Sequence, residues 1–160
     1  MMGAMHPPTP HPFRLALILA ALATLGPFSI DTFLPAMPAI GQALHAPPLA
    51  VQQALTVYLL GYGVMMLWHG AISDAVGRKP VIVISTAVFT LASVGCAFAQ
   101  TLPQLLVFRA LQGISGGAGL IVGRAIIRDC FDGAAAQRLM SHVTMLFSLS
   151  PAIAPVVGGW

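Results

Sequence analysis

Long apolar stretches, broken by a few charged positions, dominate the pattern of this chain. Charged side chains are absent from residues 15–30, 32–73, 80–108, 110–123 and 139–160. A helix needs about 20 mostly apolar residues to cross a bilayer, and these runs are continuously apolar rather than alternating as in an outer-membrane barrel. The pattern therefore predicts an all-α membrane protein with five spanning helices. We expect them at about residues 13–40, 51–73, 80–100, 102–126 and 138–160.

The segment before the first apolar run has a different character. Residues 1–12 contain four prolines and two histidines, which is typical of a disordered tail. The triplet Ala21-Leu22-Ala23 resembles a signal-peptide cleavage site. However, the apolar sequence continues as far as Pro38, which favours an uncleaved first span.

The distribution of cationic residues predicts the orientation in the membrane. Only 7% of the 160 residues are charged, and the net charge is +3. The connections at about 41–50 and 99–103 contain no Lys or Arg, so all the cations other than Arg109 lie at or near the opposite ends of the spans. These six are Arg14, Arg78, Lys79, Arg124, Arg128 and Arg138. By the positive-inside rule the tail at residues 1–12 is cytoplasmic, and the positive charge requires no nucleic-acid partner.

Several functional classes find no support in the residues. The two cysteines, Cys96 within a span and Cys130 in a loop, give neither a disulfide framework nor metal-ligand spacing. The histidines are isolated, and no nucleophile lies in a recognisable set with a base. We therefore expect no metal site and no enzyme activity.

Asp31 and Arg109 are single charges inside apolar runs. A charge at bilayer depth costs roughly 2.5–3.5 kcal/mol even on lenient insertion scales. If the first span ends near Ile40, Asp31 lies about 14 Å deep, and Arg109 lies about 10 Å below the start of its own span. Matched depth and opposite sign predict a pair that moves protons or ions or binds a charged ligand. The alternative is that Asp31 lies near the outer interface and is merely solvated.

A glycine- and charge-containing turn follows the second span. Within residues 70–80 the pattern is formed by Gly70, Asp74, Gly77, Arg78 and Lys79. A tight cationic turn closed by Pro80 would suit any protein with several spans. The whole string nevertheless resembles the signature loop of the major facilitator superfamily, which gates conformational change on the cytoplasmic side. Ala75 departs from the pattern, where a cation is usual, and this suggests a weaker latch.

The fourth span combines Arg109 with glycines on one helix face. Gly113 and Gly117 have the Gly-x-x-x-Gly spacing of a packing seam. A nucleotide-binding loop is not expected, because no strand precedes these glycines. Packing leaves Arg109 unexplained. The string Arg109-Ala-Leu-Gln112-Gly113 resembles the arginine-x-x-glutamine-glycine motif of facilitator drug/proton antiporters, in which the arginine is tied to proton coupling.

Two further strings extend the resemblance. Asp31-Thr-Phe-Leu-Pro35-Ala-Met-Pro38 is similar to the first-helix signature of the bicyclomycin-resistance-type (Bcr/CflA) multidrug exporters. The fifth span, with Pro155, Gly158 and Gly159, resembles the antiporter motif glycine-x-x-x-glycine-proline-x-x-glycine-glycine. Ser150 and Ala154 replace its first two glycines, and both are small enough for close packing.

The resemblance implies an N-terminal fragment, the first five helices of a twelve-helix fold, with residues 13–160 forming part of its first six-helix half. It implies proton-coupled efflux of small lipophilic drugs across the bacterial inner membrane by the full-length parent. Asp31 would bind a proton or the substrate, Arg109 would stabilise its ionised form, and Gln112 belongs to the same site. The partners would be the drug, protons, the lipid bilayer and the remaining helices, with the proton gradient in place of a cofactor. Two alternatives are a metabolite importer of the same superfamily and a fragment that transports nothing.

Overall fold

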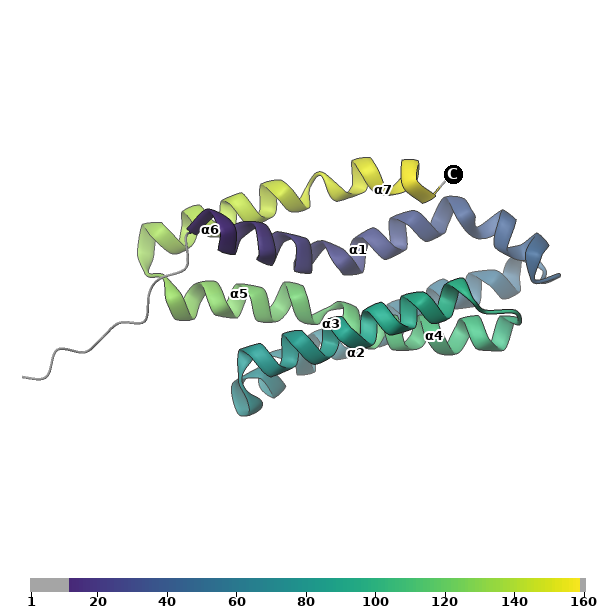
Figure 1. Ribbon diagram of the computed structural model, residues 1–160, viewed down its shortest axis with the longest axis horizontal. Coiled ribbons are helices and arrows are strands. Elements are labelled where there is room, and N and C mark those ends of the chain that lie inside the picture. The colour runs from purple at the N-terminus through teal and green to yellow at the C-terminus, as the bar shows by residue number, and fades with distance from the viewer. Residues whose placement is uncertain (1–11, 159–160) are drawn as a thin grey trace, which may run out of the picture.

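The computed structural model describes residues 12–158, and these form helices joined by short connections. The helices lie side by side along one long axis (Figure 1). In chain order they are α1 (Pro12–Ala43), α2 (Pro48–Val76), α3 (Arg78–Ala97), α4 (Leu102–Gly116), α5 (Ala118–Cys130), α6 (Gly133–Phe147) and α7 (Ser150–Gly158). The tail expected at residues 1–12, apart from Pro12, lies outside the described residues, as does Gly159.

Five stretches are long and apolar enough to cross a membrane, which confirms the predicted all-α fold with five spans. Two of them combine consecutive helices. Helices α4 and α5 make the stretch Leu102–Cys130, interrupted only at Gly117, and α6 and α7 make Gly133–Gly158. Helix α3 ends at Ala97, before the predicted residue 100, whereas other helices extend beyond the predicted spans. For example, α2 begins at Pro48 because proline suits the first turn, where its missing N–H has no helical partner.

Helix α1 bends along its length (Figure 1). It contains Pro27, Pro35 and Pro38, and each of them removes a backbone donor from the helix. A side chain from the neighbouring helix reaches this region: the Tyr58 hydroxyl donates to the Gly26 carbonyl over 2.8 Å. The irregular part of α1 is thus tied to α2 close to the first proline.

Small residues let the helices approach closely. A Cβ atom added at Gly113 would overlap the Tyr58 carbonyl group on α2. Added at Gly117, it would lie 3.2 Å from the flexible Met66 side chain, which can move aside. The contact at Gly113 therefore fixes the spacing of α2 and α4 more strictly than the contact at Gly117.

Two apolar clusters hold α1 to its neighbours. One centres on Leu19, Ile127 and Leu139, where α1 meets α5 and α6. The other centres on Phe33, Val51 and Leu105, where α1 meets α2 and α4. Large apolar side chains also cover much of the outer surface, as the exposed Leu67 and Leu91 illustrate. An apolar surface of this kind suits lipid or further helices rather than water.

Candidate functional site

Arg109 is buried where α1, α2 and α4 meet, with 3% of its surface exposed. Its Nη1 group donates to Ser29 Oγ and to Gln112 Oε1, each over 2.9 Å. The guanidinium carbon lies 4.1 Å from the ring centre of Phe33 and 4.5 Å from that of Tyr58. Two aromatic rings therefore stabilise the buried cation by cation–π contact, and two hydrogen bonds orient it.

A short polar chain extends this site into α3. Gln112 Nε2 donates to Ser93 Oγ over 2.7 Å, and Ser93 in turn donates to the Phe89 carbonyl over 2.7 Å. The Cys96 thiol donates to Gln112 Oε1 over 3.5 Å. Gln112, predicted beside Arg109, is thus held from two directions. It presents its carbonyl oxygen to the guanidinium.

Part of Arg109 has no partner within the described structure. Its Nε and Nη2 atoms are buried and make no hydrogen bond. Leaving a buried donor unpaired costs about 1–3 kcal/mol, and more when the group is charged. These two atoms lie on one edge of the planar guanidinium, the arrangement that matches both oxygens of a carboxylate.

The expected contact between Asp31 and Arg109 is not formed. Within residues 12–158 the ion pairs are those of Arg78, with Asp74 and with Asp129. Arg109 instead contacts Ser29 and Phe33, which share one face of α1. Asp31 is roughly 200° around the helix from Ser29, so its side chain lies on another side of α1.

A cavity of about 580 Å³ lies between α1, α3 and α4. Arg109, Gln112 and Cys96 line it together with Ser29 and Thr32. Apolar residues complete the wall, among them Phe33, Ile40, Leu44 and Leu105. Among the described residues 12–158 no acidic side chain lines the cavity, so Asp31 does not face it.

The cationic turn predicted after the second span is built around Arg78. Gly77 has φ of 103°, which favours glycine and allows the sharp reversal between α2 and α3. Arg78 Nε donates to Asp129 Oδ2 over 2.9 Å, and Nη1 contacts Ser73 and Asp74. The turn is thereby linked to the end of α5.

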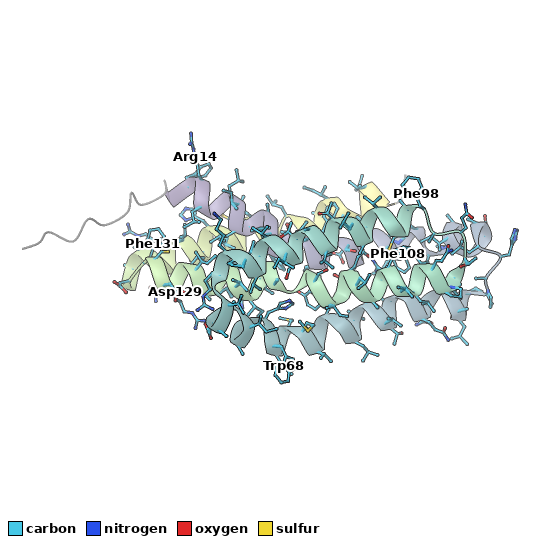
Figure 2. The ribbon with its side chains drawn as sticks, turned by 60° about the horizontal axis from the view of Figure 1, so that its bottom comes forward. Arg14, Trp68, Phe98, Phe108, Asp129 and Phe131 are labelled. Atoms are coloured by element: carbon cyan, nitrogen blue, oxygen red, sulfur yellow. The ribbon has the colours of Figure 1, made fainter. Side chains whose placement is uncertain are left out.

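Two other residues predicted for this loop, Lys79 and Gly70, are less closely packed than Arg78 and Gly77. Lys79 is exposed. A Cβ atom added at Gly70 would meet only Ile121, at an ordinary contact distance of 3.8 Å. Asp129 lies at the same end of the bundle as Arg14, while Phe98 lies at the opposite end (Figure 2). The two cationic regions therefore share one end, as the charge pattern required.

The antiporter-like string of the last span lies against α1. Pro155 is inside α7. A Cβ atom added at Gly158 would overlap the Thr32 backbone, next to Asp31 in the sequence. This string therefore serves close packing beside the part of α1 that carries the acidic residue.

Sequence reasoning did not single out Ser29, Phe33, Tyr58 and Ser93 as parts of the site. Their spacing held a partial signal, because Ser29 and Phe33 are four residues apart and so share a helix face. Which neighbouring helix that face meets cannot be read from the spacing alone.

Residues 17–160 match the family described as the Major Facilitator Superfamily. The chain belongs to this superfamily. It is therefore a membrane protein with several spans, from a family of transporters of small molecules. This confirms the fold family expected from the motifs.

Several similar proteins carry names that refer to drug resistance. The chain is 37% identical over 145 residues to multidrug resistance protein MdtL of Klebsiella pneumoniae, and 34% identical over 146 residues to multidrug resistance protein D of Escherichia coli. It is 32% identical over 148 residues to a bicyclomycin resistance protein homolog of Haemophilus influenzae. These matches include 91–92% of the chain but only 37% of each relative. The chain thus spans little more than a third of their length.

Proposed function

We propose that the transporter containing this chain exports small lipophilic drugs from the bacterial cytoplasm in exchange for protons. The observation that carries the proposal is a buried arginine held beside a cavity with mostly apolar walls, in a facilitator-superfamily fold. Relatives named for multidrug and bicyclomycin resistance support the direction of transport and the class of substrate.

In this proposal Asp31 carries the proton, and its charge attracts the Arg109 guanidinium across α1. Asp31 is on one side of α1 and Arg109, from α4, packs against another side; the diameter of a helix is about 10 Å. Opposite charges at that separation attract by about 1–2 kcal/mol at an effective dielectric constant of about 20. Protonation of Asp31 removes this attraction. The flanking Pro27 and Pro35 give α1 the freedom to change its bend in response.

The Arg78 cluster serves as the latch of the same cycle. It joins the turn between α2 and α3 to the end of α5, so a movement of α5 must break or carry the contact with Asp129. Gly70, Asp74, Gly77 and Lys79 belong to this latch by their resemblance to the superfamily's loop. The other half of the transporter would close against this surface.

Several further features belong to the proposal. The transporter lies in the bacterial inner membrane with its N-terminus in the cytoplasm, in keeping with the shared cationic end (Figure 2). The proton gradient supplies the energy, no cofactor takes part, and no chemical bond of the substrate is changed. Its partners are the drug, protons, lipid and the remaining helices of the transporter.

Transport by everted membrane vesicles tests this function. Vesicles containing the full-length transporter should accumulate drug when respiration acidifies their interior, and a protonophore should release it. Asp31→Asn should abolish accumulation, whereas Asp132→Asn, an exposed position before α6, should not. Drug or metabolite uptake by right-side-out vesicles, with none by everted vesicles, would identify an importer instead.

A further inference from the structure

The cavity between α1, α3 and α4 combines a buried cation with mostly apolar walls. We propose that it binds an amphipathic organic anion, whose carboxylate pairs with the free edge of Arg109 while its apolar body lies along the cavity wall. This inference names a substrate class for the proposed exporter and so rests on that function. It can nevertheless be tested without transport.

The free edge of Arg109 is the first observation. Nη1 donates to Ser29 and Gln112, whereas Nε and Nη2 are buried and have no hydrogen-bond partner among residues 12–158. Ser29 and Gln112 are neutral, so among the described residues the guanidinium has aromatic and neutral polar contacts but no anionic partner. A bidentate carboxylate would satisfy both donors and the charge together.

The composition of the cavity wall is the second observation. Within the part of the chain that the structure describes, no Asp or Glu lines it, so a cationic drug would find the guanidinium and no counter-charge there. The volume of about 580 Å³ lies within the range of small-molecule pockets. Phe33, Leu105 and Ile40 provide apolar surface for a ring system. The wall therefore favours anions over cations of the same shape.

Phe33 contacts both Arg109 and the cavity. Its ring centre lies 4.1 Å from the guanidinium carbon, and the residue also lines the cavity. In the proposed complex this ring rotates aside so that the carboxylate reaches the free donors, and the ligand's own ring takes over the aromatic contact. The Tyr58 ring, 4.5 Å from the guanidinium carbon, keeps its contact with Arg109.

Cys96 provides a reporter of occupancy, because its half-buried thiol lines the same cavity. The experiment uses the full-length transporter in an uncharged detergent, with Cys130→Ser and cysteines elsewhere in the protein replaced. The rate at which N-ethylmaleimide alkylates Cys96 is measured with 2-naphthoate or with its cationic counterpart 2-naphthylmethylammonium.

We expect 2-naphthoate to protect Cys96 in a saturable manner and the ammonium compound to leave the rate unchanged. Arg109→Gln should weaken the protection by roughly tenfold to a hundredfold, the equivalent of losing a hydrogen-bonded charge pair. The protection of Arg109→Lys should be intermediate between that of wild type and that of Arg109→Gln, because an ammonium keeps the charge but lacks the planar fork. Arg128→Gln removes an exposed arginine from the neighbouring helix and should retain full protection.

Three results would overturn the inference. They are equal protection by the cation, protection that survives Arg109→Gln, and a thiol that no probe protects because another part of the transporter fills the cavity. None of these results depends on drug export. Export without protection would reject only the anion site, whereas protection without export would reject only the proposed function.

Discussion

Replacing Gly113 by alanine tests the packing that positions Arg109. The added Cβ atom would overlap the carbonyl group of Tyr58, which is backbone and cannot rotate away. Helices α2 and α4 must therefore separate, and overpacking of this kind destabilises a fold by about 1–3 kcal/mol. The separation also moves the Tyr58 ring away from the guanidinium of Arg109.

Gly63 provides a matched control on the facing helix. It is exposed, and a Cβ atom added there would have no neighbour within 4 Å. Gly63→Ala should therefore stabilise α2 slightly, by up to about 1 kcal/mol from helix propensity. The two variants should differ by about 1–4 kcal/mol in unfolding free energy, which is the sum of the two effects.

Unfolding of the purified transporter in mixed micelles, titrated with sodium dodecyl sulfate, measures this difference. The midpoint should fall for Gly113→Ala and stay or rise for Gly63→Ala. Drug export should fall only for Gly113→Ala. Equal midpoints for the two variants would refute the close approach of α2 and α4 at this position.

Three further predictions concern the latch, the α1–α2 link and the orientation. Arg78→Ala should slow transport without preventing membrane insertion, and Asp129→Asn should have a similar effect. Normal transport rates in both variants would show that the Arg78 cluster does not act as a latch. Tyr58→Phe should lower the unfolding free energy by about 1 kcal/mol through loss of a buried hydrogen bond, and an unchanged midpoint would show that this bond contributes nothing. A cysteine introduced at Ala46 should react with an impermeant thiol reagent outside intact cells, whereas one at Ala135 should not; the reverse pattern would invert the topology.

The five spans could be predicted because each apolar run is long enough to cross a bilayer without charge. The finer division of the helices was not predictable in this way. Gly117 interrupts the fourth span, yet it follows Gly113 and Gly116 in a stretch where several glycines could equally end a helix. Their spacing does not distinguish them, and the packing around each one involves residues far away in the sequence, such as Tyr58 at Gly113 and Met66 at Gly117.

The candidate site was predictable in its main charge and not in its contacts. Arg109 stood out because a lone cation in an apolar run must have a compensating environment. The sequence suggested Asp31 as its partner, since both lie at one depth. In the structure Ser29 and Phe33, on another side of α1, contact Arg109 instead. Aromatic compensation by Phe33 and Tyr58 has no sequence signature, because either ring could equally face lipid.

Drug-induced proton release from the purified transporter tests the central claim, that Asp31 couples proton movement to export, most directly. In weakly buffered detergent solution, adding drug to the wild-type protein should release protons, and Asp31→Asn should release none because the titrating group is gone. Asp132→Asn should behave as wild type. Release of as many protons by Asp31→Asn as by wild type would contradict the account and make Asp31 a structural residue.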